Sequence, residues 1–101
     1  METDEGIHGW GEVGSSVAVS ENFMGTAIKE VSESLIGENP MDTDRLWNKI
    51  FRLFSYMGSR GFTTSLTAGF DIALWDIKGK VSGLPIYDLL GGRYRDPVRL
   101  Y

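Results

Sequence analysis

The fold is decided by the stretch LTAGFDIALWDIKGK, which covers residues 66–80 of the 101-residue chain. Its apolar residues recur every three or four positions, and this spacing predicts one long helix with a single buried face. The helix is predicted to begin near residues 63–65, and its apolar face carries Leu66, Phe70, Ala73, Leu74, Ile77 and Val81. Gly83 follows the last apolar turn and Pro85 stands two residues further on, so we expect the helix to end there.

Two more amphipathic helices are predicted before this one. The first begins after Ser20, a suitable N-cap, and ends before Gly37. Its apolar face carries Met24, Ala27, Ile28, Val31 and Leu35. The second is capped by Asp42, and its apolar face carries Leu46, Trp47, Ile50, Leu53, Phe54 and Met57. A short helical turn is expected over residues 86–90.

Both ends of the chain have the pattern of β-strands. Residues 3–13 are predicted as a hairpin or part of one, because Asp4-Glu5-Gly6 is a turn signal and alternating residues follow it. Residues 97–101 also alternate apolar and polar side chains. An isolated hairpin is marginal in water, and the terminal strand has no partner here. We therefore expect sheet-forming sequence to be missing at both ends.

Composition argues against several classes of function. The chain has no cysteine and one histidine, which excludes a disulfide framework, a Cys-type zinc site and a His-rich metal site. The net charge is −4 with dispersed basic residues, unlike a nucleic-acid-binding surface. No apolar run approaches the roughly 18 residues of a membrane span, and the acidic N-terminus lacks the features of a secretory signal. We expect a cytoplasmic protein that binds neither nucleic acid nor membranes.

The charged residues of the long helix do not form a catalytic pair. Asp71 and Asp76 are five residues apart, so they point about 140° away from each other on a helix. Asp76 and Lys80 are four apart and are expected to form a modest ion pair. These residues are interpreted as scaffold, and His8 as an exposed side chain.

Residues 66–80, continued through GLPIYDLLGG at residues 83–92, resemble the signature region of the mandelate racemase and muconate-lactonizing group in the enolase superfamily. The positions that match are Asp71, Ala73, Leu74, Asp76, Gly79, Lys80, Pro85, Leu89, Leu90 and Gly91. Leu66 and Phe70 depart from the pattern but keep the apolar face. Residues 3–12 resemble the end of the sheet in the family's N-terminal cap, and residues 97–101 resemble the start of the first barrel strand.

The resemblance implies an α+β fold: an incomplete enolase-type N-terminal cap, in which the end of an antiparallel sheet and a helical bundle lead into the first strand of an absent (β/α) barrel. The implied domains are a partial cap over residues 1–92 and a linker with that strand over residues 93–101. It also implies a Mg²⁺-dependent parent enzyme that stabilises an enolate. Because the family's metal ligands and bases lie on later barrel strands, no catalytic or metal-binding residue is expected here.

Within the family, Gly9-Trp10-Gly11-Glu12 and residues 73–80 look most like sugar-acid dehydratases. The resemblance therefore implies a sugar acid as the substrate of the parent, a homo-oligomeric assembly, and no activity of this chain alone. A racemase or cycloisomerase of the same superfamily is an alternative. A stand-alone helical interaction module, which has kept a cap sequence without its barrel, is another.

Two loops hold the candidate substrate-binding residues. In the family, a mobile cap loop follows the strand that residues 9–12 resemble, and here it contains Ser15 and Ser16, whose hydroxyls can bond to a polyhydroxylated substrate. The loop over residues 56–61 contains Arg60, which can pair with a carboxylate through two hydrogen bonds. The alternatives are an ordinary surface connection for the first loop and a solvated arginine in the second.

Overall fold

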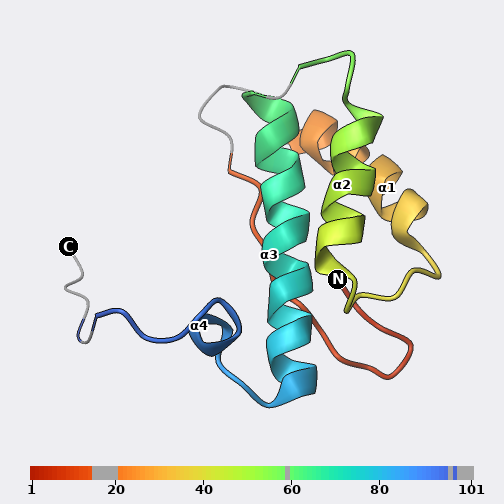
Figure 1. Cartoon of the computed structure of the whole chain (residues 1–101). Coiled ribbons are helices and arrows are strands. Elements are labelled where there is room, and N and C mark those ends of the chain that lie inside the picture. Colours follow the sequence, from red (N-terminus) through yellow and green to blue (C-terminus); the bar gives the residue numbers. More distant parts are fainter. Residues whose placement is uncertain (15–20, 59, 96, 98–101) are drawn as a thin grey trace.

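The computed structural model describes residues 1–14, 21–58, 60–95 and 97, and this part of the chain contains four helices. They are α1 (Glu21–Leu35), α2 (Thr43–Leu53), α3 (Phe62–Ser82) and α4 (Ile86–Leu89). Figure 1 shows α2 and α3 side by side and antiparallel, with α1 behind them and α4 away from α2. No helix in the described ranges is long and apolar enough to cross a membrane.

The core lies where α3 meets α2 and α1. Its fully buried side chains are Leu46, Ile50, Leu66, Leu74 and Ile77, and Val31 of α1 is 2% exposed. This confirms most of the predicted apolar face of α3. Val81 is an exception, at 47% exposed. Lys78 Nζ lies 3.4 Å from Thr43 Oγ1 at the start of α2, so Val81, almost one turn further along α3, lies beyond the end of α2.

The predicted helix boundaries hold at α3 but not at the end of α2. Gly83 ends α3 in the left-handed conformation at φ 65°, where a residue without Cβ has no steric penalty. By contrast, α2 ends at Leu53, and Met57 N donates to Phe54 O at 2.8 Å in a tight turn. Met57 is 76% exposed, so its predicted place in the apolar face was wrong.

The predicted sheet is absent from the described residues, and the α+β class is corrected to a helical one for this part of the chain. Residues 1–14 contain the expected turn, with Gly6 at φ 76°, but only one isolated antiparallel bridge joins Glu2 and His8. A strand needs a neighbouring strand for its backbone groups, and α3 lies beside this segment instead (Figure 1). Of the predicted terminal strand, only Pro97 is described.

Side chains of α3 bind the backbone of the N-terminal segment directly. Trp10 N donates to Asp76 Oδ2 at 2.8 Å, and Lys80 Nζ donates to His8 O at 2.7 Å. Asp76 and Lys80 also form the predicted ion pair at 2.7 Å. Lys80, followed by the Trp10 amide, lowers the pKa of Asp76 below its usual range. These two residues of the signature stretch therefore connect sequence positions about 70 residues apart.

Candidate functional site

Both segments that carry candidate binding residues are flanked by contacts at the N-terminal end of α3. Ser65 Oγ, in the first turn of α3, donates a hydrogen bond to Gly14 O. The rings of Phe23 in α1 and Phe62 in α3 lie 5.0 Å apart. We call this region the loop end and define it by Gly14, Phe23, Gly58, Arg60, Phe62 and Ser65. Ser15 and Ser16 themselves lie outside the described residues.

Arg60 stands on the second segment of the loop end. The flanking glycines, Gly58 at φ 90° and Gly61 at φ 75°, adopt conformations that side chains disfavour. Thr63 Oγ1 donates to Gly58 O at 2.9 Å and ties the turn to the first turn of α3. Arg60 is exposed and forms no ion pair within the described part of the chain. Its guanidinium is therefore available for an anion at this end.

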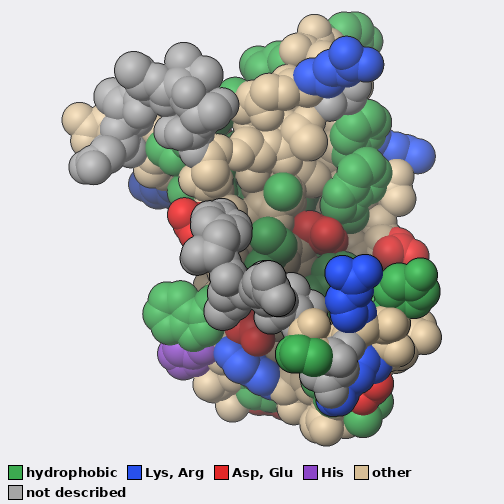
Figure 2. Space-filling model, turned by 90° about the vertical axis from the view of Figure 1, so that its left-hand side faces the viewer, with side chains coloured by type: hydrophobic (Ala, Val, Ile, Leu, Met, Phe, Trp, Pro, Cys, Tyr) green, Lys and Arg blue, Asp and Glu red, His purple; other side chains and the backbone are tan. Residues whose placement is uncertain are grey.

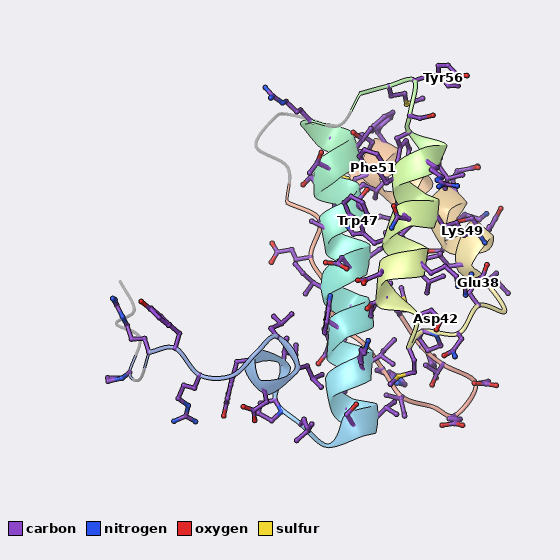
Figure 3. The ribbon with its side chains drawn as sticks, in the orientation of Figure 1. Glu38, Asp42, Trp47, Lys49, Phe51 and Tyr56 are labelled. Carbon is purple, nitrogen blue, oxygen red and sulfur yellow. The ribbon has the colours of Figure 1, made fainter. Side chains whose placement is uncertain are left out.

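Of the two side chains that precede this turn, Tyr56 was placed in the loop over residues 56–61 from the sequence, and only Met57 was assigned wrongly. Tyr56 is fully exposed, and Figure 3 shows it projecting beyond the end of α2, whereas Met57 was assigned to the core. The helical spacing of apolar residues continues through Met57, so periodicity alone places it on the buried face. The pair of glycines at 58 and 61 was the signal that the chain reverses there.

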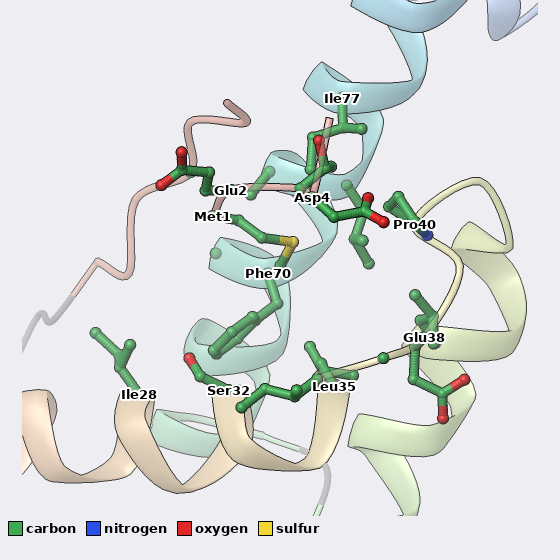
Figure 4. A pocket seen from close by; sticks show the side chains of 18 of the residues that line it. Met1, Glu2, Asp4, Ile28, Ser32, Leu35, Glu38, Pro40, Phe70 and Ile77 are labelled. Atoms are coloured by element: carbon green, nitrogen blue, oxygen red, sulfur yellow. The ribbon is translucent and has the colours of Figure 1, made fainter. Parts of the chain in front are cut away.

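The cavity beside the N-terminal segment is not a sugar-acid site. It has a volume of about 690 Å³ and lies between the N-terminal segment, α1 and α3 (Figure 4). Met1, Ile28, Leu35 and Phe70 are among the apolar side chains that line it. A site for a polyhydroxylated anion needs several convergent polar groups, and the walls of this cavity are mostly apolar. Arg60 does not line it.

The remaining polar candidates do not assemble into a catalytic centre. His8 is exposed as predicted, with Nε2 3.7 Å from Glu2 Oε1, and Figure 2 shows the histidine on the surface. No group of three or more His, Asp or Glu side chains within the described ranges is arranged to hold a metal ion. Because Mg²⁺ prefers several oxygen ligands in octahedral geometry, these residues do not fit a magnesium site.

These features define a helical unit in which contacts at one end of α3 hold the flanks of two loops. By its sequence, the chain belongs to the family of mandelate racemase and muconate lactonizing enzymes. Residues 1–91 match the profile of that family's N-terminal domain. Over all 101 residues the chain is 45% identical to a D-galactonate dehydratase of Variovorax paradoxus strain S110, of which it covers 26%.

Two solved structures resemble the helical unit closely. One is a member of the enolase superfamily from Salmonella Typhimurium, with a TM-score of 0.83 and 41% identity over 93% of this chain and 24% of that one. The other is the L-talarate dehydratase of Polaromonas sp. JS666, complexed with Mg and L-glucarate, with a TM-score of 0.82 and 39% identity over 97% of this chain and 27% of that one. The chain thus spans about a quarter of the length of these relatives.

Proposed function

We propose that the chain is the substrate-capping part of a Mg²⁺-dependent dehydratase of sugar acids, and that its loop end faces the substrate. The observation that carries the proposal is that Ser65 contacts Gly14 and Phe23 contacts Phe62, so the flanks of both candidate loops meet at one end of α3. The relatives named as D-galactonate and L-talarate dehydratases support the reaction class.

The proposal gives the loops the task of binding and orienting the substrate. Arg60 pairs with a carboxylate of the sugar acid, and the hydroxyls of Ser15 and Ser16 bond to its hydroxyl groups. Magnesium, when bound, stabilises the negative charge of the enolate. Since the described residues do not fit its ligand set, we assign the metal and the proton-transferring groups to the part of the enzyme that follows the cap.

The proposal also includes the organisation of the parent enzyme. The cap covers residues 1–92, and residues 93–101 form a linker and the first barrel strand. The parent is a cytoplasmic homo-oligomer. The cap by itself carries out no dehydration, because the metal and the bases belong to the barrel.

A chimera tests the proposal without requiring any other sequence from the parent. The matching 101 residues of the Variovorax D-galactonate dehydratase are replaced by this chain, and Mg²⁺-dependent dehydration is measured with D-galactonate, L-talarate and L-glucarate. We expect the chimera to dehydrate at least one of these acids and the 101-residue chain to dehydrate none. A folded chimera that dehydrates none of them, or that interconverts epimers instead, contradicts the dehydratase assignment.

The role of Arg60 is tested in the same chimera. Arg60→Ala removes a charge-assisted hydrogen bond, which is worth about 1.5–3 kcal/mol, so we expect KM to rise at least about tenfold. The control is Lys29→Ala, which removes an exposed cation of α1 away from the loop end and should leave KM unchanged. Equal KM values for the two variants would remove Arg60 from the proposed site.

A further inference from the structure

Two hydroxyl side chains in the first turn of α3 each hold the backbone of a different candidate loop. Thr63 Oγ1 donates to Gly58 O at 2.9 Å, and Gly58 stands two residues before Arg60. Ser65 Oγ donates to Gly14 O, and Gly14 is the last described residue before the first loop. Both acceptors therefore lie at the edge of a segment that carries candidate binding residues.

The position of the two hydroxyls in the helix explains why they bond outside it. Within a helix, Ser and Thr hydroxyls commonly bond the carbonyl four residues earlier, as Thr67 Oγ1 does with Thr63 O at 2.8 Å. Thr63 and Ser65 lie in the first turn, where the residues four positions earlier precede the helix. They are also two positions apart, so they point about 160° away from each other around the axis. The two hydroxyls can therefore reach segments on opposite flanks of α3.

The N-terminal segment is fixed along the length of α3 before it reaches Ser65. Lys80 Nζ donates to His8 O near the C-terminal end of the helix. Further along, a Cβ at Gly69 would lie 2.5 Å from Val13 Cγ2, so the segment passes α3 with no room for a side chain there. The bond from Ser65 follows at the next residue of the segment. It fixes the described residue from which the first loop continues.

The turn that carries Arg60 is tied to the helix by Thr63. Gly58 and Gly61 have positive φ values, 90° and 75°, and glycine gives the backbone more conformational freedom than any other residue. Thr63 is 7% exposed, so its bond to the turn lies at the edge of the core and is shielded from water. Loss of this bond would remove a restraint on the turn and so on the place of Arg60.

We propose that Thr63 and Ser65 are positioning residues for the substrate of the parent enzyme. Neither touches the substrate. Each holds one carbonyl group, of Gly58 or of Gly14, and together they fix the spacing between Arg60 and the start of the first loop. The inference rests on the proposed function, because it needs both loops to bind the sugar acid. It adds that a single turn of α3 sets the distance between the group that binds the carboxylate and the groups that bind the hydroxyls.

Paired substitutions in the chimera with the Variovorax enzyme test the role of each hydroxyl. Thr63→Val and Ser65→Ala remove the hydroxyl, whereas Thr63→Ser and Ser65→Thr keep it. We expect KM to rise roughly three- to tenfold in the first pair, which is the range expected for the loss of one neutral hydrogen bond. The value of kcat should change by less than about twofold, because the lost interactions serve binding and not the chemical step. The second pair should keep a KM close to that of the unsubstituted chimera.

A double-mutant cycle shows whether Thr63 acts through Arg60. In a chimera that already carries Arg60→Ala, Thr63→Val should raise KM by less than about twofold, because the side chain that Thr63 positions is gone. Ser65→Ala should keep its full effect in the same background, since it acts on the other loop. An effect of Thr63→Val that is the same with and without the Arg60 side chain contradicts the proposed positioning.

Thr67→Val is the matched control for the loss of a hydroxyl from α3. Thr67 is 4% exposed, and its hydroxyl bonds within the helix and holds neither Gly58 nor Gly14. The substitution should therefore leave KM unchanged. If it raises KM as much as Thr63→Val does, a general loss of stability explains both effects and the inference is wrong.

Carbonyl 13C chemical shifts of the 101-residue chain provide a measurement that does not depend on activity. A carbonyl resonance responds to the hydrogen bond that the oxygen accepts, so Thr63→Val should shift the Gly58 carbonyl and leave that of Gly14 in place. Ser65→Ala should do the reverse. The absence of these shifts contradicts the two hydrogen bonds and overturns the inference.

The two measurements together separate this inference from the proposed function. Carbonyl shifts as expected, with an unchanged KM in an active chimera, show that the two hydroxyls are only structural, which overturns the inference and leaves the proposed function intact. A folded chimera that dehydrates none of the acids removes the proposed function, and this inference with it.

Discussion

At the scale of single residues, glycine sets how closely the N-terminal segment approaches α3. A Cβ atom at Gly11 would lie 2.0 Å from Gly69 O, and one at Gly9 would lie 2.2 Å from Ala73 O. The obstructing atoms are backbone atoms, which cannot rotate away. The three glycines in residues 6–11 indicated a close backbone approach already in the sequence, but the residues approached are about 60 positions away and no local pattern identifies them.

Gly11→Ala should therefore destabilise the chain. Forcing an extra methyl group into packed backbone typically costs about 1–3 kcal/mol, and we expect the free energy of unfolding to fall by that amount in urea titrations. Gly25→Ala is the matched control, because a Cβ there meets no atom within 4 Å and alanine favours the helix. It should stabilise the chain by up to about 1 kcal/mol. Equal effects of the two substitutions would mean that the segment does not pack on α3 as described.

At the scale of elements, the helices could be predicted from the sequence, whereas the structural partner of the extended N-terminal segment could not. A helix satisfies its backbone groups internally, so the spacing of Leu66, Phe70 and Ile77 and the stop at Gly83 were sufficient. The extended segment depends on a partner, and the alternation of its side chains does not say which partner it has. Its backbone groups bond to Asp76 and Lys80, side chains that sequence reasoning had paired only with each other.

The same limit applies to the candidate site. The two loops could be predicted from composition. That they lie at the same end of α3 became visible only from the contact between Ser65 and Gly14 in the structure.

The connection between α1 and α2 is held by a carboxylate with two cationic neighbours. Glu38 accepts hydrogen bonds from Arg45 at 2.8 Å and from Lys49, whose Nζ also donates to Ser34 O at the end of α1. The bonds from Arg45 and then Lys49 lower the pKa of Glu38 from its ordinary value of 4.5 to about 2. Between these values the unfolded chain binds more protons than the folded one, so stability from this group rises with pH across that window.

Glu38→Gln should accordingly cost stability in a pH-dependent manner. The loss relative to the unmodified chain is expected to be complete above about pH 4.5 and to shrink as the pH falls toward 2. Urea unfolding at several pH values between 2.5 and 6 measures it. Glu30→Gln changes an exposed carboxylate of α1 without such partners and should show no pH-dependent loss. A constant difference for Glu38→Gln would show that the cations do not hold its charged form.

At the scale of the whole molecule, burial is concentrated in α3. Nine of its residues are buried, whereas Val31 is the one fully buried side chain described in α1, and α4 has none. The cavity of about 690 Å³ separates the N-terminal segment and α1 from part of α3. Helices with few buried contacts open at lower free energy than the global unfolding of the chain. The molecule is therefore a firm α2–α3 pair with a less tightly attached α1.

Amide hydrogen exchange should resolve this hierarchy, with the slowest exchange in the middle of α3 and faster exchange in α1 and α4. Ser32 lines the cavity from α1, so Ser32→Leu adds apolar atoms to empty space, and cavity filling commonly contributes about 0.5–2 kcal/mol. We expect this variant to slow exchange in α1 by roughly tenfold, because it strengthens the attachment of that helix to α3. Ser82→Leu, at an exposed position at the end of α3, should leave α1 unchanged. If α1 and α3 instead exchange together at the rate of global unfolding, the chain is one cooperative unit, and the cavity does not weaken the attachment of α1.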